Sequence, residues 1–195
     1  MHGLINRSIQ CFLRDTFGAP FWQQVTQEAR LGFDGFEAML DYDDALSDAV
    51  IAAAGRLLDR SRDSLLEDLG TYLVTGTGDR GLRRLLRFGG PTFSDFLLSL
   101  DEIPDRARLA LPDIELPVLE VVEHAGANLT LWCRFPLPGA GHVIVGLLRA
   151  MADDYGALCL VEHRGEAAGA EVVGVSLAAA AFAAPRPFDL AMPPV

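Results

Sequence analysis

The spacing of the apolar residues changes once along the chain, near Pro112 and Pro117, and this change constrains the fold most. Before it, apolar residues recur at helical spacing, as Ile5 and Ile9 do within residues 3–16. After it, apolar and polar residues alternate, as they do in strands. The sequence therefore predicts an α+β fold, in which an N-terminal helical lobe precedes a four-stranded antiparallel sheet with one crossing helix.

The length of 195 residues and the large apolar fraction favour a single domain. We expect the helical lobe over residues 1–111, the sheet-containing lobe over 112–178 and an Ala/Pro-rich tail over 179–195. The expected helices cover 3–16, a segment from Pro20 through Val25, a segment from Asp43 or Asp44 through Leu57, then 64–74, 79–88 and 141–155. The expected strands cover 118–124, 129–135, 157–163 and 171–177.

One further helix is expected after Gly89-Gly90-Pro91. Thr92 and Asp95 have the spacing of a capping box, which marks a helix N-terminus. Because proline lacks an amide donor and disfavours helix at the preceding residue, we expect this helix to run until the residue before Pro104.

Charge and composition narrow the class of partner. The net charge is -11, and the only dense basic group is the four arginines within 80–87, so binding to nucleic acid or to an anionic membrane surface is not expected. Membrane insertion is not expected either, because no run of about twenty apolar residues occurs. All sixteen basic residues are arginine, which excludes a catalytic lysine. Three widely spaced cysteines and the lack of a run of about twenty apolar residues lead us to expect a cytoplasmic protein, and the exclusive use of arginine favours a bacterial source.

Catalytic and metal-binding motifs are missing from the sequence. It contains no P-loop, nucleophile elbow, dinucleotide fingerprint or zinc spacing, and its four histidines form no HxxxH pair. We therefore expect neither an enzyme nor a metal site built from such motifs.

Three segments resemble the haem-nitric-oxide/oxygen-binding (H-NOX) family of sensor domains. Met1-His2-Gly3-Leu4 is similar to the family's N-terminal M-x-G-hydrophobic pattern. Leu100-Asp101-Glu102-Ile103-Pro104-Asp105 resembles the LDxxHD-like segment that supplies the iron-binding histidine, and residues 129–148 resemble the segment around the Y-x-S-x-R motif that binds the haem propionates.

The resemblance also shows what this chain lacks. Pro104 stands at the histidine position, and Cys133, Phe135 and Leu137 stand at the three polar positions of Y-x-S-x-R. These substitutions lead to the expectation that no cofactor, and in particular no haem, is bound. The expected function is a haem-free sensor whose apolar pocket holds a lipid-like ligand such as a fatty acid.

Two alternatives remain open at this stage. One is a module with a filled pocket that regulates a signalling kinase or cyclase; the other is a haem and nitric-oxide sensor with a replacement axial ligand, either His142 or Cys133. Counting from Gly146 places Val143 rather than His142 on the distal wall. The candidate pocket residues are Ile5, Ile9, Phe96, Leu100, Pro104, Pro117, Cys133, Phe135, Leu137, Val143 and Leu147.

Overall fold

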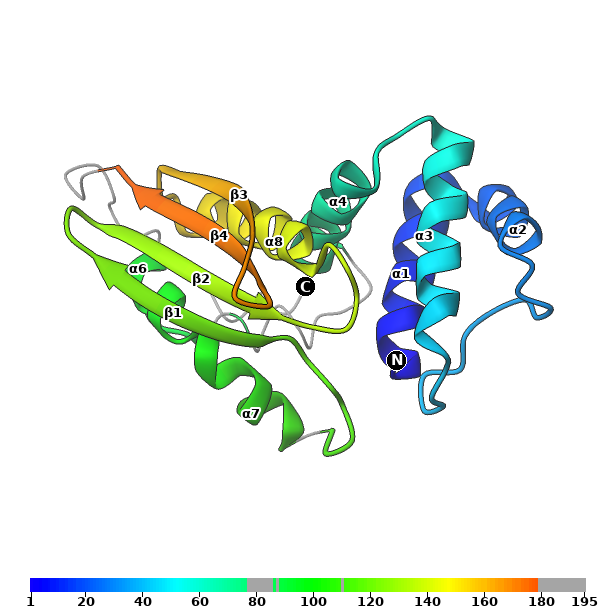
Figure 1. Cartoon of the computed structure of the whole chain (residues 1–195), viewed down its shortest axis with the longest axis horizontal. Coiled ribbons are helices and arrows are strands. Elements are labelled where there is room, and N and C mark those ends of the chain that lie inside the picture. The colour runs from blue at the N-terminus through cyan, green and yellow to red at the C-terminus, as the bar shows by residue number, and fades with distance from the viewer. Residues whose placement is uncertain (77–85, 87, 110, 179–195) are drawn as a thin grey trace, which may run out of the picture.

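The computed structural model describes residues 1–76, 86, 88–109 and 111–178. Figure 1 shows two lobes, one formed by α1, α2 and α3 and the other by the sheet with α6, α7 and α8, and α4 lies between them. The helices are α1 (Gly3–Phe17), α2 (Ala19–Glu28), α3 (Asp44–Leu58), α4 (Arg62–Thr75), α6 (Phe93–Leu98), the 3-10 helix η1 (Leu100–Glu102), α7 (Ile103–Arg108) and α8 (Ala140–Tyr155).

Local sequence signals account for most helix starts. The Asp43 carboxylate accepts the amide hydrogen of Ala45 at the start of α3, and the Ser61 hydroxyl caps α4 in the same way. Proline occupies the first turn of α2, where its missing N–H costs nothing. Thr92 and Asp95 form the expected capping box of α6. The helix starts expected from these signals are confirmed, whereas of the helix expected over 79–88 only residues 86 and 88 are described.

The sheet has four antiparallel strands in the order β1-β2-β4-β3. The strands are β1 (Val118–His124), β2 (Asn128–Arg134), β3 (Cys159–Ala167) and β4 (Ala170–Leu177). Leu131 of β2 pairs with Val121 on β1 and with Val173 on β4. Alternate residues of the strands therefore form one apolar surface, which packs against α8. The predicted α+β architecture with one crossing helix is therefore confirmed.

The buried side chains form two hydrophobic clusters. The helical cluster contains Ile9, Phe12, Leu13, Trp22, Val25, Leu31, Phe36, Val50, Ile51, Ala53, Ala54, Leu65, Leu66, Leu69 and Leu137. The sheet cluster lies between the sheet, α6 and α8, and its fully buried members include Phe96, Leu97, Leu100, Leu131 and Leu148.

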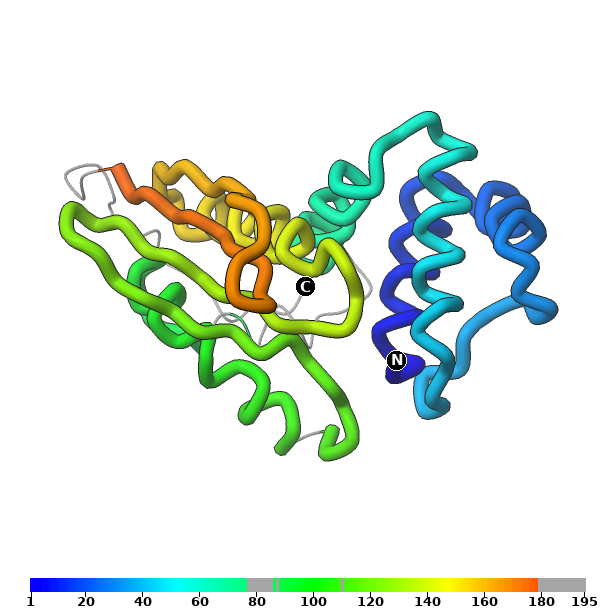
Figure 2. Tube along the Cα trace, in the orientation of Figure 1, coloured from blue at the N-terminus to red at the C-terminus, as the bar shows by residue number. Residues whose placement is uncertain are grey.

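Helices α4 and α8 join the two lobes by a close backbone crossing. A Cβ atom built on Gly70 would lie 2.0 Å from the carbonyl oxygen of Val143, and one built on Gly146 would lie 1.8 Å from that of Glu67. Only glycine allows backbones to approach this closely. The Cα trace also shows the loop between β2 and α8 reaching from the sheet toward the helical lobe (Figure 2).

The helix that begins at Thr92 ends earlier than expected, so that prediction is wrong. Helix α6 stops at Leu98, a 3-10 turn follows, and Pro104 lies in the first turn of α7. The physical reason is that a proline in the first turn loses no helical hydrogen bond, so Pro104 is tolerated near a helix start rather than after a helix end. The tail over 179–195 lies outside the described residues.

Candidate functional site

The candidate pocket residues are divided between the two hydrophobic clusters. Phe96, Leu100, Cys133 and Leu147 belong to the sheet cluster, Ile9 and Leu137 belong to the helical cluster, Val143 packs against the helical cluster, and Phe135 packs against both. Pro104 is buried, and Ile5 and Pro117 are half-buried. The structure thus brings most of these side chains into two neighbouring cores, and Phe135 contacts the two.

Phe135 and Leu137 lie on the loop that joins β2 to α8. Leu137 is only 4% exposed and extends the helical cluster, although the chain around it belongs to the sheet lobe. Arg62 at the start of α4 holds this loop, because its Nη2 and Nε atoms donate to the carbonyl oxygen of Pro138 at 2.8 and 3.1 Å. The loop therefore connects the lobes through both an apolar and a polar contact.

The position matched to the family's iron-binding histidine carries no metal ligand. Pro104 is one of the buried residues of α7, and proline has no side-chain atom that could bind a metal. The nearby acidic groups point outward, where Asp105 forms an ion pair with Arg108 at 2.5 Å. Among the described residues, no group of three or more His, Cys, Asp or Glu side chains is arranged to hold a metal ion.

Cys133 is unsuited to thiolate ligation. Burial, with a smaller contribution from the negative charge of Glu171, raises the pKa of the Cys133 thiol to about 12. A metal-binding cysteine must lose this proton, and buried apolar surroundings oppose the loss. Cys133 therefore packs as a small apolar side chain on the inner face of β2.

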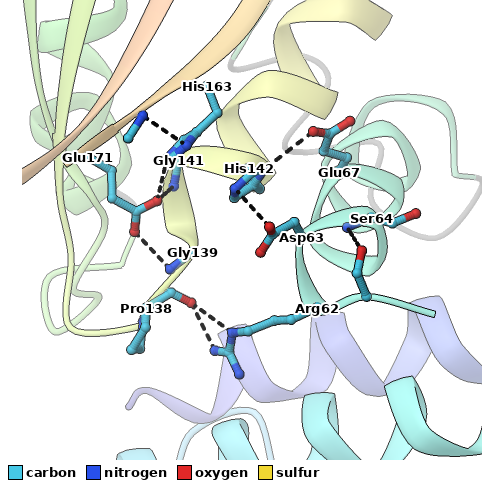
Figure 3. Close-up of polar contacts among 12 residues, drawn as sticks. Arg62, Asp63, Ser64, Glu67, Pro138, Gly139, Gly141, His142, His163 and Glu171 are labelled. Atoms are coloured by element: carbon cyan, nitrogen blue, oxygen red, sulfur yellow. Dashed lines mark hydrogen bonds and ion pairs between the residues drawn. The ribbon is translucent and has the colours of Figure 1, made fainter. Parts of the chain in front are cut away.

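His142, the other replacement ligand considered, is engaged by carboxylates. Its Nδ1 lies 3.2 Å from Glu67 Oε1, and its Nε2 lies 3.7 Å from Asp63 Oδ2 (Figure 3). The ring stacks on His163 with 4.0 Å between the centroids, and His163 Nε2 lies 2.9 Å from Glu171 Oε2. We call these five side chains, Asp63, Glu67, His142, His163 and Glu171, the histidine cluster.

The Glu171 carboxylate also fixes the start of α8. It accepts the amide hydrogens of Gly139 at 2.8 Å and Gly141 at 3.0 Å, and a Cβ on Gly141 would collide with Glu171 and His163. Sequence reasoning missed the histidine cluster and treated His142 and His163 as separate residues. The only signal in the sequence was the four-residue spacing of Asp63 and Glu67, which places both on one face of a helix.

Two hollows lie in and on the helical lobe. The first is a small apolar hollow of about 10 Å³, a volume that admits about one water molecule, and it is lined by Ile9, Phe12, Leu13, Ile51, Ala54, Leu65, Leu66 and Leu69. The second is an open surface groove of about 470 Å³ along the end of α3 and the start of α4. Of the candidate pocket residues, only Ile9 lines either of them.

None of the helices formed by the described residues is long and apolar enough to cross a membrane.

A family model described as "Haem-NO-binding" matches residues 2–163 of this chain. Among curated proteins, the chain is 25% identical over 154 residues to soluble guanylate cyclase gcy-31 of Caenorhabditis elegans, covering 79% of this chain and 22% of that protein. It is 23% identical over 155 residues to soluble guanylate cyclase 89Db of Drosophila melanogaster, covering 80% and 23%. The chain therefore spans less than a quarter of the length of each of these relatives.

Solved structures share the fold. The unliganded Fe(II) H-NOX protein from K. algicida superposes with a TM-score of 0.75 at 19% identity, covering 91% of this chain and 97% of that one. The H-NOX protein from S. oneidensis in the Fe(II)NO state gives a TM-score of 0.76 at 13% identity, covering 91% and 99%.

These comparisons contradict the expectation that no cofactor belongs with this chain. The matched family is described as haem-NO-binding, and the structural neighbours are Fe(II) H-NOX proteins. The residues at the resemblance's anchor positions, Pro104, Cys133, Phe135 and Leu137, do not supply an iron ligand or polar propionate contacts. The family match covers most of the sequence and the fold agrees with it, so the chain belongs to the haem-NO-binding (H-NOX) family of sensor domains.

Proposed function

We propose that this chain is a regulatory sensor domain that takes an amphipathic guest where its two lobes meet. The guest has an apolar body and one or more carboxylates. The haem macrocycle with its propionates and a fatty acid share this chemistry, so both are sources of a suitable guest. Burying an apolar body against apolar side chains would supply most of the affinity.

The observation that carries this proposal is the position of Phe135. This half-buried ring packs against both hydrophobic clusters and lies on the loop that joins β2 to α8. Val143 packs beside the helical cluster and is also half-buried, as is Ile5. Phe135 and Val143 therefore provide apolar surface at the junction that the two cores have not already enclosed.

A guest at this junction would act on the contacts between the lobes. Displacing Phe135 would pull on Leu137 in the helical cluster and on the hydrogen bonds from Arg62 to Pro138. The backbone crossing of Gly70 and Gly146 leaves α4 and α8 little freedom to separate. A movement of the β2–α8 loop would therefore rotate one lobe relative to the other, because the packed interior does not deform locally.

The output of the sensor is proposed to be a signalling partner protein. The relatives named above are soluble guanylate cyclases, and this chain matches less than a quarter of each. With a net charge of -11, the chain would favour a partner with a basic face, and binding would weaken as salt rises.

A second candidate is an interaction module whose pocket is filled by its own side chains. The supporting observation is that Ile9, Leu100, Leu137 and Leu147 are each less than 10% exposed and already packed within the two clusters. In that case the chain would regulate its partner without any guest.

The two candidates are separated by a guest-binding experiment on the full chain. Protein from cells supplied with a haem precursor is examined by absorption spectroscopy and native mass spectrometry, and its melting temperature is measured with added haem or fatty acid. A Soret band or haem mass identifies haem, and a lipid mass identifies a lipid-like guest. Either guest should raise the melting temperature, since it binds the folded state.

Phenylalanine variants localise the binding. We expect Phe135→Ala to lower guest occupancy, whereas Phe88→Ala should leave occupancy unchanged, because Phe88 is 78% exposed. If no guest co-purifies and neither haem nor fatty acid raises the melting temperature, the sensor proposal is wrong and the interaction module is favoured.

A further inference from the structure

The loop between β2 and α8 is held by side chains rather than by a backbone ladder. Residues 135–139, which we call the strap, lie between the end of β2 and the start of α8. Two of them, Pro136 and Pro138, lack the N–H group that a ladder needs. At the α8 end, the Ala140 amide donates to the carbonyl oxygen of Leu137 at 3.2 Å, which is a turn contact. The position of the strap therefore depends on side chains that reach it from other elements.

Two charged side chains reach the strap from different elements (Figure 3). Arg62 of α4 donates to the carbonyl oxygen of Pro138 at 2.8 and 3.1 Å. Glu171 of β4 accepts the amide hydrogen of Gly139 at 2.8 Å, and its side chain is only 12% exposed. Hydrogen bonds to charged groups are stronger than those between neutral groups, so these contacts act as two latches. Because both latches are side chains, the strap can move without breaking the ladder of the sheet.

The strap inserts one side chain into the helical core. Leu137 is 4% exposed and belongs to the helical cluster, whose other buried members come from residues 9–69. The hollow in that cluster, which Ile9 and Leu66 help to line, holds only about 10 Å³. An apolar cavity of roughly 150 Å³, the size that removal of a buried leucine can open, binds benzene. The hollow is therefore too small for a guest while Leu137 stays in the cluster.

We propose that Leu137 is a removable plug, and that the strap opens so that the apolar end of a guest takes the place of Leu137 in the helical core. The guest is that of the proposed function, on which this proposal rests, and the strap is its gate. Phe135 lies on the same strap and packs against both hydrophobic clusters, so it would move with Leu137 and uncover the junction between the lobes. The two prolines fix their own φ angles, which favours movement of the whole strap over local rearrangement.

A plug makes guest binding compete with the closed strap. The guest binds only those molecules whose strap is open, so its apparent affinity is reduced by the open fraction. Weakening either latch raises that fraction. Variants that lose a latch should therefore be less stable and yet bind the guest more tightly. A side chain that supported a pocket already formed would have the opposite effect, because its loss would weaken binding.

Hydrogen exchange, measured by NMR on the whole protein without a guest, tests the opening of the strap. Arg62→Ala removes the bonds to Pro138 and does not touch the Gly139 amide itself. Relative to amides in the middle of α3, the Gly139 amide should exchange roughly tenfold faster in this variant, the change expected for loss of one hydrogen bond to a charged group. Arg134→Ala is the matched control, since Arg134 adjoins the strap but pairs with Glu120. An unchanged relative rate in Arg62→Ala overturns the plug.

Fluorescence titration with a dansyl-labelled fatty acid tests the competition. Arg62→Ala and Glu171→Gln should each bind this probe about tenfold more tightly than the wild type does, although urea unfolding should show both variants to be less stable. Arg134→Ala and Glu120→Gln should bind the probe as the wild type does, because these two exposed side chains pair with each other. Weaker or unchanged binding by the two latch variants overturns the plug.

Benzene separates failure of the plug from failure of the proposed function. Leu137→Ala should open a cavity, so benzene should raise its melting temperature, whereas the wild type and Leu57→Ala should not respond, because Leu57 is 42% exposed. If none of the proteins binds the fatty acid but benzene stabilises Leu137→Ala, the fatty-acid guest is wrong and the plug stands. A Leu137→Ala protein that folds and does not respond to benzene overturns the plug. If Leu137→Ala does not fold, the latch variants decide, and their failure to bind the fatty acid then overturns the plug.

Discussion

The crossing of α4 and α8 predicts that Gly146→Ala destabilises the protein, although alanine is the better helix former. The new Cβ would lie 1.8 Å from the carbonyl oxygen of Glu67, whereas ordinary contacts begin at 3.4 Å. Both atoms belong to or are fixed by backbone, so no side-chain rotation relieves the collision. The helices must therefore separate by roughly 1.5 Å at this point, in an interior that is close-packed.

The expected magnitude follows from two opposing terms. Overpacking typically costs about 1 to 3 kcal/mol, and a rigid collision belongs at the upper end of that range. Replacing glycine by alanine within a helix returns about 1 kcal/mol. The net loss is then about 2 kcal/mol in the free energy of unfolding, which lowers the melting temperature of a chain of this size by about 4 to 8 °C.

Urea unfolding followed by circular dichroism measures this loss. Ala52→Gly on the exposed face of α3 calibrates the helix-propensity term alone, and it should cost about 1 kcal/mol. Gly70→Ala should resemble Gly146→Ala, because its Cβ meets the carbonyl oxygen of Val143 at 2.0 Å. The double variant should lose less than the sum of the two, since one separation relieves both collisions. A Gly146→Ala protein as stable as the wild type would refute this reasoning.

Three further predictions concern polar groups that are buried or half-buried. Ser47→Ala should lower the free energy of unfolding by about 1 to 3 kcal/mol in urea titration, because the fully buried Asn6 carboxamide would lose the hydroxyl that donates to it; an unchanged midpoint would contradict this. Cys133, whose pKa burial raises to about 12, should react with a thiol reagent at about pH 8 only after unfolding, and peptide mapping that finds it labelled in the native protein would contradict its burial. Burial and the hydrogen bond to Asp15 raise the pKa of Tyr72 above its ordinary 10.0, so its contribution to stability is present below pH 10 and lost above it. Tyr72→Phe should remove from the absorbance titration a tyrosine that ionises above the ordinary range, and it should flatten the alkaline loss of stability. An unchanged titration would count against the assignment.

Features set by neighbouring residues were predictable from the sequence. The Asp43 cap and the Thr92–Asp95 capping box depend on residues two or three positions apart, and both form as the pattern predicts. The end of α6 was not predictable from the sequence, because Pro104 marks a break without showing whether the helix lies before or after it. A proline in the first turn of a helix and one just beyond its end follow the same local rule.

Contacts between segments that are distant in the sequence could not be predicted from such patterns. His142 meets Glu67 across 75 positions, and no spacing rule links them. The assignment of Ile9 and Leu137 to one core, and of Leu100 and Cys133 to the other, likewise depends on how α4 crosses α8. Sequence periodicity shows that a residue is buried but does not show which neighbours surround it.

The position of Leu137 has a consequence for how the chain assembles during synthesis. Helices α1 to α4 precede the sheet in the sequence, so they leave the ribosome and begin to associate before the sheet exists. Their core nevertheless lacks the buried side chain of Leu137 until both strands of the first hairpin have been synthesised. The N-terminal helices therefore cannot complete their packing as an independent early unit, and the β2–α8 loop closes them in the same step that brings the two lobes together.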